Sequence, residues 1–315
     1  MRSDPRALRR LSCALLALTL ACSSSTEPAG RWTMRATMPT GRIDLAAAVV
    51  RDTIFAIGGG TSNVASCAVE AYANATDSWR ERAQIPTCRY GLAADTIGGS
   101  IYAAGGLNLS GAHLGTLEVY DPATNSWSAR APMLSHRVFF GAGSANGILY
   151  AVGGLGDAGE VLSSVEAYDP VSNLWSQRAP LHTPRYGHSV VVVNGILYAI
   201  GGFDSIGTVV ASVEAYDPAS NAWTLRSPMM TPRTFLAAGA IGGRVYATGG
   251  RDQASVGALS VFEMYDPASD TWSAEPPMLH SRSLHSVAVI GGMLFVIGGN
   301  SDSPTPTGLT ESVTP

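Results

Sequence analysis

Short apolar runs separated by turn residues follow one another along most of the chain. Ile148–Val152 is one such run, and Ser189–Val192 is another. The second is followed by Asn194-Gly195, a pair that suits a two-residue hairpin because both central residues of such a turn need a positive φ. Beyond the first thirty residues, no segment of the sequence sustains the 3.6-residue period of an amphipathic helix. The pattern therefore predicts an all-β protein built of short strands.

The predicted strands recur in a repeat of about 48 residues. Six glycine doublets mark the repeat, with steps of 47, 48, 48, 48 and 49 residues between them. The doublets are Gly58-Gly59, Gly105-Gly106, Gly153-Gly154, Gly201-Gly202, Gly249-Gly250 and Gly298-Gly299. About a dozen residues after each doublet comes a glutamate, usually followed by Tyr-Asp-Pro, and a tryptophan stands seven residues after each of these tyrosines. A period of this size indicates one structural unit per repeat.

These features resemble the kelch repeat, and the resemblance covers residues 31–315. It implies a propeller of six blades with four strands in each. The sixth repeat stops at Pro315 before its tryptophan, whereas Trp32–Pro39 matches the segment that starts at Trp127. We therefore expect the N-terminal strand to complete the last blade. Closure of the ring removes the unpaired edges that an open array would expose.

The first thirty residues have the pattern of an export signal and a tether. Four arginines precede the apolar run Leu11–Ala21, which at eleven residues is too short to cross a bilayer core of about 30 Å. Ala21-Cys22 and the serines after it resemble a bacterial lipobox, in which the cysteine thiol takes diacylglycerol. We expect a signal peptide at residues 1–21, a lipidated tether at 22–30, and a protein anchored to the bacterial cell envelope, on its periplasmic side or at the cell surface. Ordinary signal cleavage with an incidental Cys22 is the alternative.

Composition excludes several classes of function. All 20 basic residues are arginines, so Schiff-base lysines and Walker-type phosphate loops are excluded. A formal net charge of −4 argues against a nucleic-acid partner. The sequence also lacks the Gly-x-Ser-x-Gly and His-Glu-x-x-His motifs of common hydrolases. We expect a monomer without a cofactor or metal, which meets a membrane only through its lipid anchor.

An arginine stands ten residues after every tryptophan, and this set is the first candidate site. The arginines are Arg42, Arg89, Arg137, Arg185, Arg233 and Arg282. The predicted topology places them on the face that carries the variable loops after the glycine doublets, which we name the upper face; the tight hairpins lie on the opposite, lower face. A guanidinium pairs with a carboxylate in a bidentate manner, and the kelch resemblance implies that such arginines grip acidic peptides. We therefore predict that the arginines ring the mouth of the channel and, with Tyr186 and His188, bind a protein partner or an acidic or carbohydrate ligand. In the alternative interpretation each arginine braces its own loop, which repetition in six blades favours.

The repeated glutamates are interpreted as scaffold, because one active site needs one or two acids and not six. They are Glu70, Glu118, Glu166, Glu214, Glu263 and Glu311. We expect them to pair with the arginines three residues past each tryptophan, which are Arg35, Arg82, Arg130, Arg178 and Arg226, although Glu275 takes this place in the fifth blade. His188 and His285 lie in separate blades, and no third ligand at metal-binding spacing joins them.

An enzyme of carbohydrate chemistry is the alternative function. Exported kelch propellers similar to this one include sialic acid mutarotases, but their catalytic residues match no particular positions here. Galactose oxidase is a further relative, and its copper chemistry needs a cysteine–tyrosine crosslink that this chain does not suit, since its only cysteines after Cys22 are Cys67 and Cys88. Export to an oxidising compartment predicts a disulfide between these two. Two separate thiols remain the alternative, because sequence spacing does not determine the Cα–Cα distance.

Overall fold

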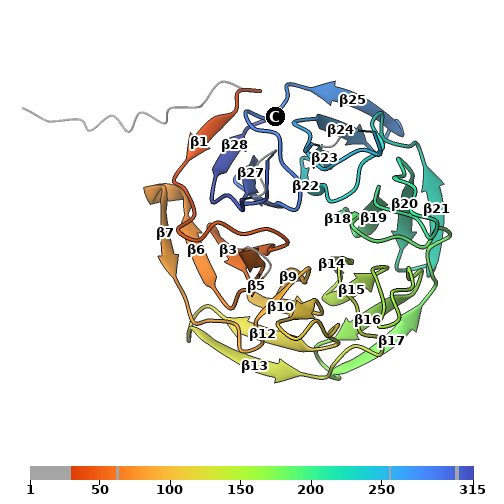
Figure 1. The fold of residues 1–315 in the computed structure, drawn as a ribbon. Coiled ribbons are helices and arrows are strands. Elements are labelled where there is room, and N and C mark those ends of the chain that lie inside the picture. The colour runs from red at the N-terminus through yellow and green to blue at the C-terminus, as the bar shows by residue number, and fades with distance from the viewer. Residues whose placement is uncertain (1–29, 62–63, 255–256, 302–304) are drawn as a thin grey trace, which may run out of the picture.

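Six four-stranded antiparallel sheets stand around a central axis as the blades of a propeller (Figure 1). The structure, a computed structural model, describes residues 30–61, 64–254, 257–301 and 305–315. The all-β, six-bladed fold predicted from the repeat is therefore confirmed. The predicted signal peptide and Cys22 lie outside the described residues, so these two interpretations stay predictions.

Each blade runs from the axis outward in the order of its strands, except the sixth. The innermost strands are β2 (Ala46–Val50), β9 (Ala93–Ile97), β14 (Gly141–Ala145), β18 (Ser189–Val193), β22 (Ala237–Ile241) and β26 (Ser286–Ile290). The second strands are β3 (Thr53–Ile57), β10 (Ser100–Ala104), β15 (Ile148–Val152), β19 (Ile196–Ile200), β23 (Arg244–Thr248) and β27 (Met293–Ile297). The third strands are β6 (Val69–Ala73), β12 (Leu117–Asp121), β16 (Val165–Asp169), β20 (Val213–Asp217), β24 (Phe262–Asp266) and β28 (Thr310–Val313). The outer strands are β7 (Ser78–Glu81), β13 (Ser126–Arg130), β17 (Leu174–Arg178), β21 (Ala222–Arg226), β25 (Thr271–Glu275) and β1 (Thr33–Arg35).

Smaller elements occur in the loops of the first two blades. They are the hairpin of β4 (Gly60–Thr61) and β5 (Val64–Ala65), the paired strands β8 (Arg89–Tyr90) and β11 (Leu107–Asn108), and the 3-10 turn η1 (Asn74–Thr76). In the ranges that the structure describes, no helix is long and apolar enough to cross a membrane.

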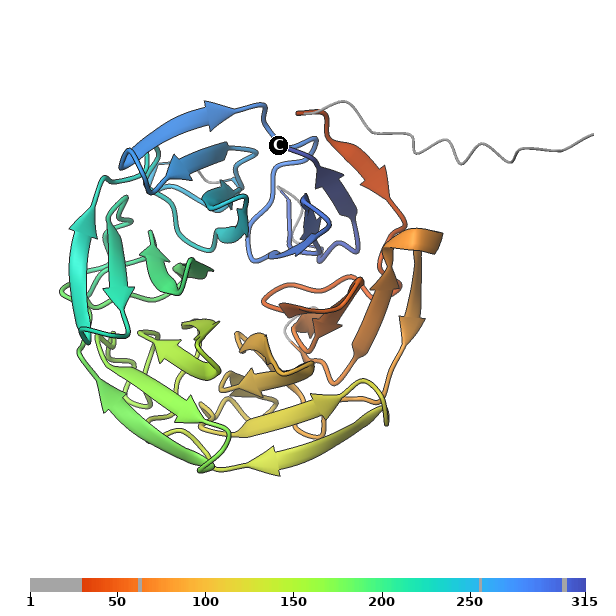
Figure 2. The same ribbon diagram turned by 180° about the vertical axis from the view of Figure 1, so that it is seen from behind.

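The last blade is closed by the first strand of the chain. β1 pairs antiparallel with β28, with Met34 opposite Glu311. The two views of the ribbon show β1 beside β28, completing the ring (Figures 1 and 2). Trp32 links this strand to the fifth blade, because its indole N–H donates to the Pro276 carbonyl at 2.9 Å and its ring packs edge-on against Phe262. The predicted closure by the N-terminal strand is confirmed.

Tryptophan links every neighbouring pair of blades in the same way. Each indole N–H donates, at 2.8–2.9 Å, to the carbonyl four residues after the preceding tryptophan. In blades one to five an Asp or Asn with positive φ adds a second link. Its Oδ1 accepts both the tyrosine hydroxyl of its own blade and a backbone N–H of the preceding blade. These residues are Asp77, Asn125, Asn173, Asn221 and Asp270. The tyrosine and tryptophan of the repeat thus join the blades to one another.

Small residues stand where the inner strands converge on the axis. A Cβ added at Gly143 of β14 would come within 2.8 Å of Val192 in the next blade. Further out, the second strands are buried along almost their whole length, as in β15 with Leu149 and Val152 both fully buried. This gradient of side-chain volume matches the wedge between two blades, which is narrow at the axis and wider outside.

Candidate functional site

The six arginines predicted to ring the channel mouth lie inside the blades. Their side chains are at most 1% exposed, and each guanidinium pairs with the glutamate of its own blade. The Nη2–Oε distances are 2.7 Å for Arg42–Glu70, 3.0 Å for Arg89–Glu118, 2.5 Å for Arg137–Glu166, 2.6 Å for Arg185–Glu214, 3.1 Å for Arg233–Glu263 and 2.7 Å for Arg282–Glu311. The prediction of an exposed arginine ring is therefore wrong, because every guanidinium is buried and paired with a glutamate inside its own blade.

The predicted partners of the glutamates are wrong for the same reason. The arginines three residues past each tryptophan end the outer strands, and most of them are exposed; for example, Arg82 and Arg130 both face solvent. A glutamate carboxylate buried on the third strand needs a cation that is buried with it. Of the two sets of arginines, only Arg42 and its five equivalents are buried together with the glutamate of the same blade.

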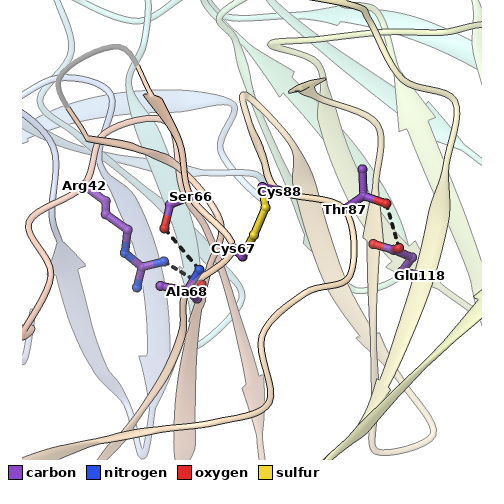
Figure 3. Close-up of a disulfide and its surroundings, with 7 residues drawn as sticks. All are labelled: Arg42, Ser66, Cys67, Ala68, Thr87, Cys88 and Glu118. Atoms are coloured by element: carbon purple, nitrogen blue, oxygen red, sulfur yellow. Dashed lines mark hydrogen bonds between the residues drawn. A yellow bond between two sulfur atoms is a disulfide. The ribbon is translucent and has the colours of Figure 1, made fainter. Parts of the chain in front are cut away.

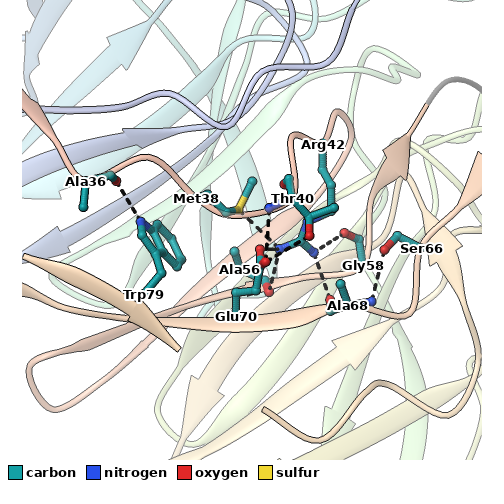
Figure 4. Close-up of polar contacts among 10 residues, drawn as sticks. All are labelled: Ala36, Met38, Thr40, Arg42, Ala56, Gly58, Ser66, Ala68, Glu70 and Trp79. Carbon is teal, nitrogen blue, oxygen red and sulfur yellow. Dashed lines mark hydrogen bonds and ion pairs between the residues drawn. The ribbon is translucent and has the colours of Figure 1, made fainter. Parts of the chain in front are cut away.

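Each buried pair ties together three segments of its blade, as Figure 4 shows for the first. Arg42 donates to the carbonyls of Gly58 and Ala68 at 2.6 and 2.9 Å, at the turn formed by the glycine doublet. Glu70 accepts from the backbone N–H and the hydroxyl of Thr40 in the loop that enters the blade. Burial lowers the pKa of the Arg42 guanidinium, and the neighbouring Glu70 opposes this shift. These contacts identify the arginines and glutamates as scaffold.

A second ring of residues, two positions after the arginines, surrounds the axis. All six adopt the left-handed conformation, with φ between 52° and 62°. They are Asp44, Gly91, Phe139, Gly187, Phe235 and Leu284, and we name them the axial ring. Each backbone N–H donates to the carbonyl of the equivalent residue in the preceding blade at 2.6–3.0 Å, which gives a closed ring of six hydrogen bonds. For bulky residues such as Phe and Leu this conformation is strained and needs support from the surrounding structure.

Glycine and phenylalanine alternate over four blades of the axial ring, from Gly91 to Phe235. A Cβ added at Gly91 would come within 2.9 Å of the Phe139 ring, and one added at Gly187 within 3.1 Å of the Phe235 ring. Each phenyl ring therefore leans over the glycine of the preceding blade. The two phenyl rings meet edge to face, with centroids 5.5 Å apart.

A cavity of about 110 Å³ opens at the centre of the axial ring. The residues that line it include Phe139, Phe235, Asp44, His188 and His285, and the ring nitrogens of His188 are buried. Burial raises the pKa of Asp44 to about 7, although the charge of Arg251 acts in the opposite direction. Burial and the nearby arginines lower the pKa of both histidines to about 3, so they are neutral at physiological pH. The cavity is thus lined by aromatic residues and by Asp44, whose carboxyl has a raised pKa, while the neutral imidazoles are buried beneath it.

Tyr186 and His188, the two other predicted ligand-binding residues, lie at different depths beside this cavity. The Tyr186 ring is partly exposed and stacks on Phe203, with centroids 5.2 Å apart, and it also contacts Phe235. His188 is only 6% exposed and packs at the base of the cavity. Sequence reasoning missed the axial ring itself, although Arg-Tyr-Gly occurs at both Arg89–Gly91 and Arg185–Gly187, and a glycine at that place signals a positive φ.

Cys67 and Cys88 form a disulfide in the first blade (Figure 3). Their Cα atoms are 4.2 Å apart, and the bond ties the start of the third strand to the loop that leaves the blade. Over the same described ranges, no group of three His, Cys, Asp or Glu side chains could hold a metal ion.

Blade number, strand order and the way the ring is closed define a six-bladed β-propeller with a small site at the upper end of its axis. The sequence model of the KLHDC2/KLHL20/DRC7 Kelch-repeats domain matches residues 135–307, and that of the Kelch motif matches residues 88–134. The first match spans more than half of the chain, which therefore belongs to the kelch-repeat family.

Other comparisons add the fold alone. No curated protein matches the sequence. Among solved structures, the chain is similar to that of YjhT, with a TM-score of 0.77 and 17% sequence identity. The similarity covers 87% of this chain and 95% of that one.

Proposed function

We propose that this kelch propeller is an exported, lipid-anchored binding protein that holds its ligand at the axial ring. Export and anchoring rest on the pattern of residues 1–22 described above. Binding rests on the cavity and on the loops around it, which differ from blade to blade on a rigid scaffold.

One observation carries this proposal: the axial ring holds bulky side chains in a strained conformation. Phe139, Phe235 and Leu284 have φ of 54°, 52° and 58° at positions that glycine occupies in two other blades. Glycine would satisfy the backbone at all six positions at lower cost. Strain of this kind is concentrated at functional sites, where the side chain is needed for a contact outside the fold.

The chemistry of the cavity favours a polyhydroxylated ligand such as a sugar. The C–H faces of a sugar ring pack on aromatic rings, which Phe139 and Phe235 supply in the cavity and Tyr186, in contact with Phe235, supplies beside it. Hydroxyl groups donate to a carboxylate, which Asp44 supplies. The expectation of an acidic ligand loses its basis, because the arginines that supported it are paired with glutamates.

A thermal-shift screen of the full-length chain against mono- and oligosaccharides tests this function, because a ligand that binds only the folded state raises the melting temperature. For a sugar that binds, Phe235→Gly and Asp44→Asn should each weaken the affinity by about tenfold, the equivalent of one good contact. Leu134→Ala is the control, since this side chain is 60% exposed on the same face and does not line the cavity. An affinity that the first two variants leave unchanged contradicts the proposal.

A carbohydrate-active enzyme is the second candidate, and the Asp44 carboxyl favours it. A carboxyl whose pKa is raised to about 7 can take up and release a proton near neutral pH, as general acid–base catalysis requires. For any sugar found in the screen, NMR measures the rate of anomer exchange with and without the protein. Loss of acceleration in Asp44→Asn with binding retained would favour the enzyme. Binding of the sugar without faster anomer exchange would favour the binding protein over the enzyme.

A further inference from the structure

A second cavity, of about 650 Å³, lies on the lower face between the first and second blades. It is remote from the axial ring, since it is lined by the hairpin at Arg51, the hairpin at Gly98-Gly99, the outer-strand end at Arg82 and the turn at Asp121. Phe55 and Val49 give the cavity an apolar wall. We name it the lower crevice.

The lower crevice exists at a blade interface that departs from the repeat. Where Phe55 stands, the next four blades have Tyr102, Tyr150, Tyr198 and Tyr246. In the second to fourth blades these phenols face the arginine at the end of the outer strand, and its charge acts to lower the tyrosine pKa against the effect of burial. In the first blade this arginine is Arg82, which has no phenol from its own blade to meet. Within the described part of the chain, its guanidinium makes no hydrogen bond or ion pair.

Arg51, in the hairpin of the first blade, is a second residue that departs from the repeat. Its φ is 55°, and the equivalent residues are Gly98, Asn146, Asn194, Gly242 and Gly291, all with φ between 51° and 59°. Glycine and asparagine are the residues that tolerate this conformation, whereas an arginine there is strained. Arg51 is exposed, and its guanidinium also has no partner among the described residues. A strained side chain without a contact in the fold points to a contact outside it.

We propose that the lower crevice binds a small organic anion, a carboxylate or a phosphate ester. The guanidinium groups of Arg51 and Arg82 bind the oxyanion, and the carbon skeleton packs against Phe55 and Val49. Two guanidinium groups supply the planar, multiple donors that both kinds of oxyanion accept. Asp121 is the one carboxylate on the wall, and its oxygens already accept from the Ala123 N–H and the Thr124 hydroxyl at 2.8 and 3.0 Å. The crevice thus has two guanidinium groups that make no hydrogen bond or ion pair among the described residues, although the charge of Arg82 acts on the Tyr120 phenol of the second blade. They face one carboxylate whose oxygens already accept hydrogen bonds.

Titration calorimetry of the full-length chain at low ionic strength tests the proposal with three probes: phenyl phosphate, benzoate and inorganic phosphate. We expect saturable binding of at least one aromatic probe, and phenyl phosphate to bind more tightly than inorganic phosphate, because only the former uses the apolar wall. If only benzoate saturates the site, the ligand class is a carboxylate. If only phenyl phosphate does, it is a phosphate ester. Absence of saturable binding for both aromatic probes overturns the proposal.

Substitutions then locate the binding. Arg51→Gly and Arg82→Gln should each weaken it by about tenfold, through the loss of one charge-assisted pair. Arg51→Gly should also raise the melting temperature, because it relieves the left-handed strain, so a loss of affinity cannot be attributed to unfolding. Phe55→Tyr restores the phenol of the repeat next to Arg82 and should weaken binding as well. Arg80→Gln is the matched control, because Arg80 lies on β7 two residues before Arg82 and outside the cavity wall; an equal loss in this variant overturns the proposal.

Discussion

The buried arginines and the axial ring lie two residues apart in every blade, yet the first position has the same residue in all six blades and the second varies. Arginine occurs at its position in all six blades and is fully buried; its guanidinium bonds within its own blade, and its backbone carbonyl accepts from the second glycine of the doublet in the preceding blade. The axial ring contains four different residue types at six positions, and its side chains face a cavity. Repetition therefore marks the scaffold of this propeller, and departure from the repeat marks the surfaces available for binding.

Deletion of residues 31–39 tests the scaffold most severely. It removes β1 and Trp32, exposes the edge of β28 and breaks the ring between the fifth and first blades. We expect the chain to lose its cooperative melting transition and to aggregate through the exposed edge. Circular dichroism and size-exclusion chromatography measure both effects. A chain that begins at Gly30 keeps β1 and serves as the control. If the deleted chain melts within a few degrees of this control, ring closure contributes little.

Two substitutions in the fifth blade compare the two positions directly. Arg233→Gln leaves Glu263 buried without a counter-ion, which should lower the free energy of unfolding by about 3–5 kcal/mol. Phe235→Gly loses aromatic contacts but relieves a positive φ, so the net change should stay within about 1 kcal/mol. Urea denaturation measures both. Equal losses of stability would contradict the distinction between scaffold and site.

The disulfide is also a departure from the repeat, because only the first blade has cysteines at the positions of Cys67 and Cys88. It therefore tests whether every such departure serves binding. It closes a loop with a sequence separation of 21 residues, and the loop-entropy model gives a stabilisation of about 3 kcal/mol. The double variant Cys67→Ser with Cys88→Ser should lower the unfolding free energy by this order while leaving ligand binding at the axial ring unchanged. Thiol titration of the unfolded, non-reduced chain should find neither cysteine free. Two titratable thiols would contradict the bond.

The pH dependence of stability reports on the carboxyl of Asp44. Its pKa in the folded protein, about 7, exceeds the ordinary value of 3.8, so the folded state keeps a proton that the unfolded chain releases between these values. Stability contributed by the protonated carboxyl is therefore lost as the pH rises from about 4 to about 7, with no further loss above that. Asp44→Asn should lack this decline, whereas the Leu134→Ala control should follow the wild type. Melting temperatures across the range measure it, and parallel profiles for Asp44→Asn and wild type would contradict the raised pKa.

The fold could be read from the sequence because its signals repeat. Glycine doublets, tyrosines and tryptophans recur at fixed spacing, and the truncated last repeat together with Trp32 predicted the closing strand. The partners of the buried charges could not be read in this way. Two sets of arginines have similar periods, and spacing alone does not say which of them enters the blade. One clue existed: the fifth blade keeps Glu263 and Arg233 but has Glu275 in the other set.

The axial ring was harder to predict, since it depends on backbone conformation and not on residue type. Aspartate, phenylalanine and leucine do not signal a positive φ, and only Gly91 and Gly187 do so. The lower crevice is lined by Phe55, which stands where the second to fifth blades have tyrosine. Such a change becomes meaningful only when the position of Arg82, in the outer part of the same blade, is known.

Pairing of β1 with β28 sets the order in which the protein can mature during synthesis. Arg35 of β1 donates to the hydroxyl of Ser312 in β28, 277 residues later. β1 therefore leaves the ribosome long before the strand with which it pairs. Until then the first five blades can form locally, while β1 has no partner. Long-range pairing of this kind slows folding and leaves an edge open to wrong partners. The nascent chain therefore stays incompletely folded until β28 has been synthesised and has left the ribosome.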